Sequence, residues 1–237
     1  MRPRRPLCLL AVPLLILAAC ENADNPSGLK LIAGPVGPAP DTLDATPDLT
    51  VDYFIDLAFG NEYGPTTDAV RKWLDSPTVE LIDATSDDLL IVDDALDDIR
   101  AITGLVPTIV SSNGNIRVFF VKRADFDQIA DVPTTVEGAT VGLWDQDFFL
   151  LSATVLVDDA TTGQTREHVI REELAQAFGL LRDSWRVPGS IFYRGTSGQT
   201  AFSDLDEDVL ALLYSGVIRA GMTQAEVIDV LGGRQSP

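Results

Sequence analysis

Apolar side chains recur at intervals of three and four along two long segments, which is the spacing of a helix with one buried face. Residues 87–104, which read DDLLIVDDALDDIRAITG, carry acids in the first turn, where the helix macrodipole favours them. Arg166 to Ser184, which reads REHVIREELAQAFGLLRDS, has an apolar face that runs up to Gly179. A glycine there can adopt the left-handed conformation that ends a helix. Both segments are therefore predicted to be amphipathic helices.

Shorter runs of branched and aromatic residues predict strands. They lie at residues 78–82, 115–122, 140–144 and 150–158. The order of strand, helix, several strands and helix predicts an α+β domain, with one mixed, twisted sheet and two main helices behind it. Two C-terminal helices follow. One starts at a capping box of Ser203 and Asp206, and the last one begins with Thr223 and Glu226.

The N-terminal residues 1–19 are predicted to be a secretory signal peptide. Three arginines within the first five residues precede an apolar run that is too short to cross a bilayer. The tetrad Leu-Ala-Ala-Cys that ends at Cys20 resembles the lipobox of bacterial lipoproteins. This resemblance implies a diacylglycerol on the Cys20 sulfur and cleavage just before it. We therefore expect membrane attachment through this lipid, in the bacterial cell envelope and facing the periplasm, on either the inner or the outer membrane.

Residues 20–49 are rich in Pro, Gly, Ala, Asn and Asp without periodicity, which is typical of a tether, and residues 50–237 are long enough for one folded domain. Because Cys8 leaves with the signal peptide, the mature chain keeps one thiol and can form no internal disulfide. The formal charge of −19 becomes more negative by three when the three arginines are removed. Such a chain repels a phosphate backbone, which excludes nucleic acid as a partner.

The second helical segment carries polar residues in the frame of a known metal motif. Glu172, Glu173, Gln176 and Gly179 copy the spacing of H-E-x-x-H-x-x-G. In that motif two histidines one turn apart bind zinc, and the glutamate between them is the general base. Here Glu172 and Gln176 stand at the histidine positions, and Glu173 stands at the position of the base.

Residues 50–214 resemble the metzincin-like zinc endopeptidases, matrixins in particular, and more closely a family of uncharacterised bacterial lipoproteins whose central helix also lacks histidines. In the active family a third histidine follows three residues after the glycine, and here that position is Arg182, next to Asp183. A methionine-bearing turn also lies beneath the metal in that family. Residues 190–193 look like this turn, with Phe192 in place of the methionine. The resemblance implies a metzincin-like domain with a degenerate metal site at Glu172, Gln176, Arg182 and Asp183.

These residues make a poor zinc site. Gln176 is a weak neutral ligand, and Arg182 cannot lose its proton. No cofactor is therefore expected, zinc being the one considered. His168, one turn before Glu172, is either an alternative ligand or a surface residue near the helix start. Asp183 could take the place of Arg182 as a ligand if the loop shifted by one residue.

Two interpretations of the site are open. In the first, the Arg182 guanidinium takes the place of the lost cation and pairs with Glu172 or Glu173, whose burial would otherwise be costly. In the second, Glu172, Glu173 and Gln176 hydrogen-bond the following loop and hold it on the helix. Both interpretations predict a domain that does not cut peptides.

The loop at residues 183–200 is a second candidate site, because irregular segments of this length in compact domains are often functional. Its aromatic and arginine side chains are of the kinds that protein interfaces favour. The possible ligand-contacting residues are Trp185, Arg186, Tyr193 and Arg194. The alternative is that Trp185 and Phe192 fill the core beneath the loop.

Two classes of function compete. The first is a non-catalytic binding or scaffold module of the cell envelope, whose peptidase-like cleft holds an extended peptide or an envelope protein. The second is a peptidase or other hydrolase with unusual metal ligands and Glu173 as its general base. Nucleophilic catalysis has no support, since no pair of cysteine and histidine survives processing.

Overall fold

The computed structural model describes residues 47–64, 67–195 and 197–232 of the 237-residue chain. The predicted signal peptide, Cys20 and nearly all of the predicted tether lie outside the described residues. The first described helix, α1 (Pro47–Ala58), begins inside the last residues assigned to the tether and covers an apolar run that periodicity did not assign. Within the described ranges, none of the helices combines the length and the apolar character needed to cross a membrane.

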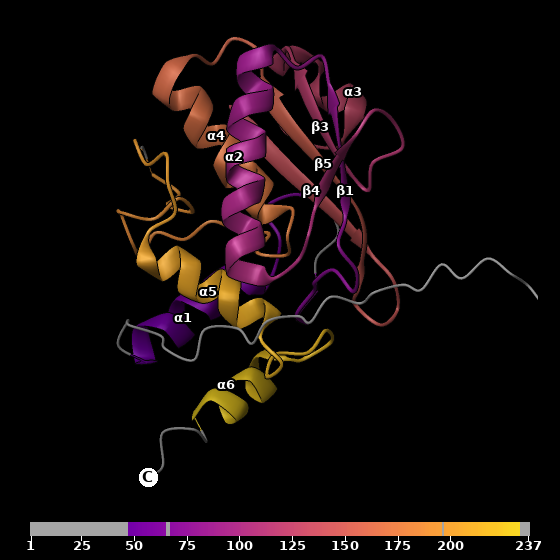
Figure 1. Cartoon of the computed structure of the whole chain (residues 1–237). Coiled ribbons are helices and arrows are strands. Elements are labelled where there is room, and N and C mark those ends of the chain that lie inside the picture. Colours follow the sequence, from indigo (N-terminus) through magenta and orange to yellow (C-terminus); the bar gives the residue numbers. More distant parts are fainter. Residues whose placement is uncertain (1–46, 65–66, 196, 233–237) are drawn as a thin grey trace, which may run out of the picture. The chain divides into compact units, whose positions relative to one another are not determined.

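A five-stranded mixed sheet lies at the centre of the domain, in the order β2-β1-β3-β5-β4 (Figure 1). Its strands are β1 (Thr78–Ile82), β2 (Thr108–Val110), β3 (Ile116–Val121), β4 (Gly138–Trp144) and β5 (Leu150–Asp158). Neighbouring strands are parallel except for β4 and β5, which run antiparallel. The four predicted strands are confirmed to within two residues, and β2 is an additional short one. As the last strand in the order, β4 lies at an edge of the sheet.

Two main helices, α2 (Ser86–Thr103) and α4 (Gly163–Gln176), cover one face of this sheet (Figure 1). Side chains alternate between the faces of a strand, so every second residue of β3 and β5 joins the same buried cluster as both helices. The opposite face packs on a smaller cluster around Phe126, in the short helix α3 (Phe126–Ile129) that follows the 3-10 turn η1 (Arg123–Asp125). The predicted α+β class, with helices packed behind a mixed sheet, is confirmed.

The helix α4 ends three residues before the glycine that was predicted to stop it. Its last residue is Gln176, whose carbonyl accepts the Gly179 N–H at 2.8 Å as the chain turns away. Gly179 has φ 117°, and a Cβ there would lie 2.5 Å from the backbone oxygen of Arg71. Only glycine fits both this conformation and this close approach. The residue therefore shapes the turn after the helix rather than the helix end itself.

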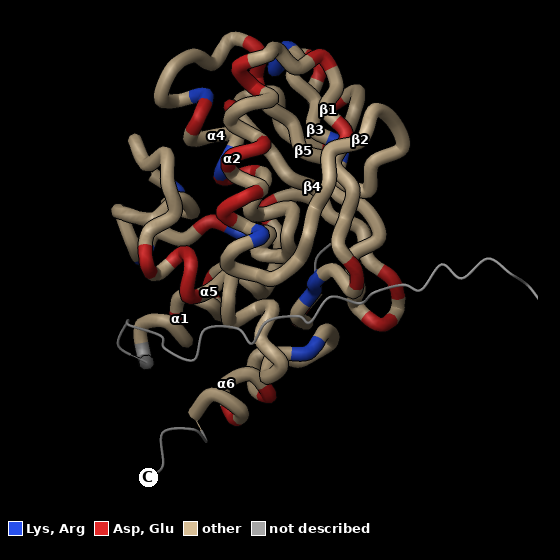
Figure 2. Tube along the Cα trace, in the orientation of Figure 1, with Lys and Arg blue, Asp and Glu red and all other residues tan. Residues whose placement is uncertain are grey.

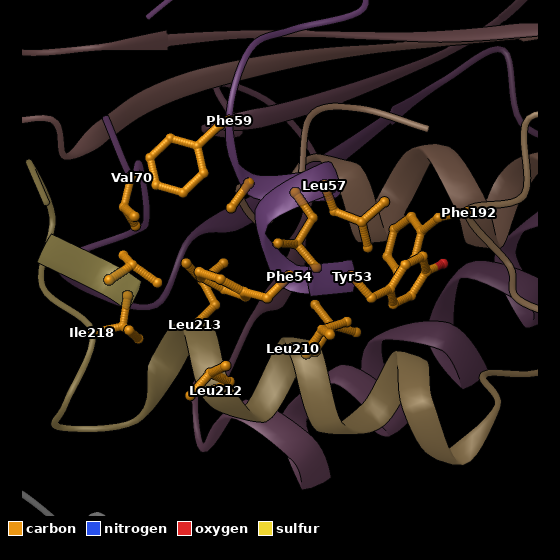
Figure 3. Close-up of a cluster of buried hydrophobic side chains, with 14 of the residues drawn as sticks. Tyr53, Phe54, Leu57, Phe59, Val70, Phe192, Leu210, Leu212, Leu213 and Ile218 are labelled. Atoms are coloured by element: carbon orange, nitrogen blue, oxygen red, sulfur yellow. The ribbon is translucent and has the colours of Figure 1, made fainter. Parts of the chain in front are cut away.

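A second hydrophobic core joins α1 to the C-terminal helices α5 (Asp204–Tyr214) and α6 (Gln224–Gly232). Figure 3 shows Tyr53 and Phe54 of α1 beside Leu210 and Leu213 of α5, with Phe192 at one end of the cluster. Phe192 is fully buried, which confirms that it fills the core beneath the loop. Trp185 is 65% exposed, so the same interpretation is wrong for this residue.

Capping boxes start both C-terminal helices as predicted. The Asp206 carboxylate accepts the Ser203 N–H at 2.9 Å, and the Ser203 hydroxyl accepts the N–H of Asp206. Asp206 also accepts the Ser190 hydroxyl at 2.5 Å, which ties the turn at residues 190–193 to α5. Thr223 and Glu226 make the corresponding contacts at the start of α6.

Ion pairs join α2 to α4 beside their shared apolar cluster. Arg166 of α4 donates to both carboxylate oxygens of Asp88, at 2.5 and 2.9 Å, and Asp88 is fully buried. Arg171, one helical turn further on, pairs with both Asp94 and Asp98. The acidic residues along α2, visible in Figure 2, thus include three that face arginines of α4.

Candidate functional site

The candidate site is built where α4 meets β4. A Cβ added to Gly138, the first residue of β4, would lie 2.7 Å from Cγ of Glu173 and 2.6 Å from Cγ1 of Val169. The absence of a side chain at this position therefore lets the helix come against the strand. Two residues on, the Thr140 hydroxyl lies 2.8 Å from the backbone carbonyl oxygen of Glu173 and 2.9 Å from its Oε2. These contacts fix both the end of α4 and the Glu173 carboxyl on the sheet.

Glu173 is buried between α4 and β4, and Thr140 is its hydrogen-bond partner on the sheet. The Thr140 hydroxyl is within donating distance of both the backbone carbonyl oxygen and Oε2 of Glu173, so the two acceptors share one donor. Burial, followed by the charges of Asp183 and Glu62, raises the pKa of Glu173 well above its ordinary value. The side chain at the predicted position of the general base is therefore harder to ionise than an ordinary glutamate.

Glu172 lies beside the chain's one histidine. Its Oε2 is 3.4 Å from Nε2 of His168, while Nδ1 of His168 lies 2.7 Å from the backbone oxygen of Gln199. The Gln199 carbonyl can only accept, so Nδ1 carries a hydrogen and Nε2 faces Glu172. Burial, then the charges of Asp183, Glu173 and others, raises the pKa of Glu172 well above its ordinary value. His168 is only 8% exposed, so the interpretation of it as a surface residue is wrong.

Asp183 joins the loop to the helix. Its Oδ1 accepts the Gln176 side-chain amide at 2.6 Å. Burial, and then the charge of Glu62 and a hydrogen bond with it, raise the pKa of Asp183 to about 8. Glu62 in turn lies 3.4 Å from Nη2 of Arg194. The structure thus gathers Glu62, Asp183 and the two glutamates of α4, although one arginine is the only cation paired within this group in the described ranges.

These side chains line a cavity of about 650 Å³, which we call the carboxylate cavity. His168 and Arg194 are the basic groups in its wall, and Tyr63 and Tyr193 contribute aromatic rings. The start of β4 forms another part of the wall. The five acids that line it are Glu62, Glu137, Glu172, Glu173 and Asp183.

The residues at the former histidine positions do not fit a zinc ion. The Gln176 amide is committed to Asp183, and Arg182 is exposed outside the carboxylate cavity. Within the described ranges, no three His, Cys, Asp or Glu side chains are placed to share a metal ion. The donor arrangement therefore supports no reaction step centred on a metal.

Arg182 does not take the place of a metal. In the described part of the chain it makes no ion pair with Glu172 or Glu173, which contradicts the first interpretation of the site. Gln176 does hydrogen-bond the following loop, through Asp183, as the second interpretation requires. Glu173 bonds Thr140 of the sheet rather than the loop.

The predicted ligand loop divides between two pockets. Tyr193 and Arg194 line the carboxylate cavity, whereas Trp185 and Arg186 line a second pocket, to which Arg194 also contributes. Backbone hydrogen bonds from Ser184 to Phe192 and from Arg194 to Ser184, both 3.0 Å, close the base of the loop. The loop is therefore a constrained structure that presents side chains to both pockets.

Sequence reasoning missed three contributors to the site. Glu62 lies in a loop 101 residues before the start of α4, and no local pattern marks it as a partner of Asp183. Gly138 and Thr140 belong to a strand whose pattern indicated only a strand. Their spacing of two did place both side chains on one face. That face could have been recognised as polar and open beside the apolar residues 139 and 141.

Comparison with known proteins gives one match to a protein family. Residues 48–233 match the family model described as "Protein of unknown function (DUF2927)". No curated protein matches the chain. The chain is similar to one structure of myroilysin at 16% identity and a TM-score of 0.40, covering 61% of this chain and 95% of that one. A second structure of myroilysin gives 17% identity and a TM-score of 0.32, with 73% and 77% covered. At these TM-scores neither likeness assigns a fold or an activity.

Proposed function

The chain belongs to the DUF2927 family, and we propose that it is a metallopeptidase-like domain that binds a partner in its cleft without cutting it. The single observation that carries the proposal is the carboxylate cavity, in which the helix residues at the motif positions are engaged in contacts within the protein. The mixed sheet is followed along the chain by α4, the turn at residues 190–193 and α5, and this order supports the metallopeptidase-like assignment.

Two contacts argue against catalysis. A general base has to be ionised and has to reach the proton that it removes. Burial and neighbouring acids raise the pKa of Glu173 well above its ordinary value, which disfavours the ionised form, and only 6% of the residue is exposed. Gln176 has its amide bound to Asp183. Neither residue is free to play the part that the corresponding position of the active motif requires.

The same cavity suits a cationic group. Its five acids outnumber its one arginine, and a buried cluster of carboxyls is relieved of mutual repulsion when a positive charge enters. We therefore propose that the partner presents a basic side chain, lysine or arginine, to Glu172 and Asp183.

The edge strand β4 can form backbone hydrogen bonds with this partner. Residues Glu137 and Gly138, at the start of β4, line the cavity, and the described residues make no backbone hydrogen bonds to the outer edge of β4. An extended peptide can add to such an edge as a further strand, with specificity supplied by a pocket for one of its side chains. The proposed ligand is therefore an extended segment of a peptide or envelope protein with one basic residue.

We also propose that the domain is held in the bacterial cell envelope by a lipid on Cys20. The lipobox-like tetrad and the preceding apolar run support this placement. Metabolic labelling with a fatty acid should mark the wild-type chain and not the Cys20→Ala variant. Equal labelling of both would refute lipid attachment at this residue.

The binding proposal is tested with the full-length protein in detergent and two peptides. Both are acetylated, amidated seven-residue alanine–serine peptides, one with a central lysine and the other with a central glutamine. Calorimetry should show at least tenfold tighter binding of the lysine peptide, which corresponds to about 1.4 kcal/mol. Glu172→Gln should remove most of this difference, whereas Asp127→Asn, an exposed acid on the other face of the sheet, should leave it intact.

Two results would overturn the proposal. Equal affinity for the two peptides would show that the cavity does not select a cation. Stoichiometric zinc in the purified protein, with chelator-sensitive peptide cleavage that Glu173→Gln abolishes, would replace the binding module with a peptidase.

A further inference from the structure

A second pocket lies next to the carboxylate cavity and has the opposite charge. It has a volume of about 480 Å³, and we call it the arginine pocket. Asp183 and Arg194 line both pockets. The two pockets are therefore adjacent. The arginine pocket is further lined by Arg182, Trp185, Arg186 and Asp56.

The three arginines of this pocket differ in their contacts with acidic side chains. Arg186 donates to Asp56 at 2.8 Å, and Arg194 lies 3.4 Å from Glu62. Arg182 is exposed and, in the described part of the chain, has neither an ion pair nor a hydrogen bond through its side chain. The charge of Arg182 helps to lower the pKa of Asp56, but the Arg182 guanidinium makes no direct bond to that carboxylate within the described residues. Its guanidinium can bind a planar anion with two parallel hydrogen bonds.

Trp185 supplies an aromatic surface beside this arginine. The ring is 65% exposed and stands perpendicular to the ring of Tyr193, with 5.9 Å between the ring centroids. Ser184, its neighbour in the chain, is buried and donates its hydroxyl to Asp56 at 2.9 Å. The indole is thus presented from an anchored backbone, and large exposed aromatic side chains of this kind are favoured at binding sites.

We infer that the arginine pocket binds a carboxylate of the same peptide segment whose basic side chain enters the carboxylate cavity. This inference rests on the proposed function, because it names the second recognition element of that ligand. The expected ligand carries a positive and a negative group a few residues apart. Arg182 forms the ion pair with the carboxylate, and Trp185 covers the intervening peptide.

The test uses the full-length protein in detergent and acetylated, amidated peptides with four combinations of end residues, each made at three spacings. Their first residue is lysine or glutamine and their last is aspartate or asparagine, separated by one, two or three alanines. Binding is followed by tryptophan fluorescence, and Trp185→Phe serves as the blank that identifies the signal from this indole. The aspartate peptides should bind about tenfold tighter than their asparagine counterparts at the best spacing, and this gain should disappear in Arg182→Gln. Arg219→Gln, which removes the same charge from another exposed site, should keep the gain.

The outcomes separate this inference from the proposed function. A gain from aspartate that depends on Arg182, without any gain from lysine, supports the arginine pocket and contradicts the proposed cation site. A gain from lysine with none from aspartate leaves the proposed function standing and overturns the inference. An aspartate gain that survives Arg182→Gln also overturns it. Because Arg182 is exposed and its side chain makes no ion pair or hydrogen bond within the described residues, its replacement should leave the circular dichroism spectrum and the unfolding midpoint unchanged.

Discussion

The helix α4 has two charged sides, and they differ in whether their charges are paired with opposite charges. Towards α2, Arg166 and Arg171 meet acids at short distances, and the buried Asp88 receives two hydrogen bonds from one guanidinium. Towards β4 and the following loop, Glu172 and Glu173 meet further acids instead. The first side contains matched charges, and the second contains carboxyls that repel one another.

The pKa values show the consequence of this difference. Burial alone would raise the pKa of Asp88, but hydrogen bonds from Arg166 and Thr85 hold it below its ordinary value. In the carboxylate cavity the compensation is too small: Thr140, Arg194 and Gln176 lower the pKa values of Glu173 or Asp183, but burial and neighbouring acids raise them by more. The paired side therefore stabilises the fold. On the unpaired side, repulsion between the carboxyls remains, and a bound cation can reduce it.

The largest effect is expected on the paired side. Asp88→Ala leaves Arg166 partly buried without its partner and removes the capping box of α2, which should cost about 3 to 5 kcal/mol of unfolding free energy. Urea denaturation measures this loss. Asp87→Ala, one residue earlier and exposed, is the matched control and should change stability by less than about 0.5 kcal/mol. Equal losses in both variants would show that the pairing with Arg166 contributes nothing.

The unpaired side should respond to pH instead. The folded-state pKa of Asp183 is about 8, above its ordinary value of 3.8, so the native state holds the extra proton. Its stabilising contribution is complete below about pH 4 and is lost as the pH rises to about 8. Each pH unit in this window costs about 1.4 kcal/mol for one proton. Asp183→Asn should flatten the stability profile between pH 5 and pH 7 by about 2 to 3 kcal/mol.

The control for this measurement is an acid that lies outside the carboxylate cavity. Asp127→Asn should leave the slope of unfolding free energy against pH as it is in the wild type. A wild-type stability that rises from pH 5 to pH 7 would contradict the assignment of protonated carboxyls to the cavity.

A smaller effect is expected where the unpaired side touches the sheet. Gly138→Ala places a Cβ 2.7 Å from Oε1 of Glu173, so α4 must shift, and we expect a loss of about 1 to 2 kcal/mol. Gly216→Ala is the matched control, since a Cβ there meets no atom within 4 Å. Thermal unfolding of the two variants compares them directly, and an undisturbed Gly138→Ala protein would show that the helix does not rest on β4.

The smallest effect on stability belongs to the arginine pocket. Trp185→Ala removes an exposed ring whose one ring contact in the described residues is with Tyr193, so unfolding free energy should fall by less than about 1 kcal/mol. Trp73→Ala, which removes a buried indole bonded to the Ala177 carbonyl at 2.9 Å, should cost several times more. A comparable loss in the two variants would assign Trp185 to the core rather than to a binding surface.

Local patterns were sufficient for most of the fold. Periodicity and capping residues predicted α2, α4 and α5, because these signals act over one or two turns of the chain. The helix α1 escaped prediction, since its identity depends on packing against α5 and α6 more than on its own pattern. The short strand β2 escaped for the same reason, as its pairing with β1 is what defines it.

The site was predictable only in part. The motif spacing singled out Glu172 and Glu173, which line the carboxylate cavity, and Gln176, which hydrogen-bonds Asp183 of its wall. The spacing misplaced Arg182, which lines the arginine pocket instead. This residue lies in the loop after α4, where the helical period no longer predicts the direction of a side chain. Asp183, the next residue, faces the cavity instead. Glu62 could not be found at all, since its role depends on a contact between distant segments of the chain.

The residues of the carboxylate cavity are far apart in the sequence, and this separation affects the order in which the chain can fold. Glu62 and Arg194 close the cavity from positions 132 residues apart, and β4 needs its pairing with β5 before α4 has a surface to rest on. Contacts of such long range form late, after local helices and hairpins. Glu62 is therefore expected to remain far from the acids of α4 during the early stages of folding. Its repulsion with them is expected only after the sheet that brings these segments together has formed.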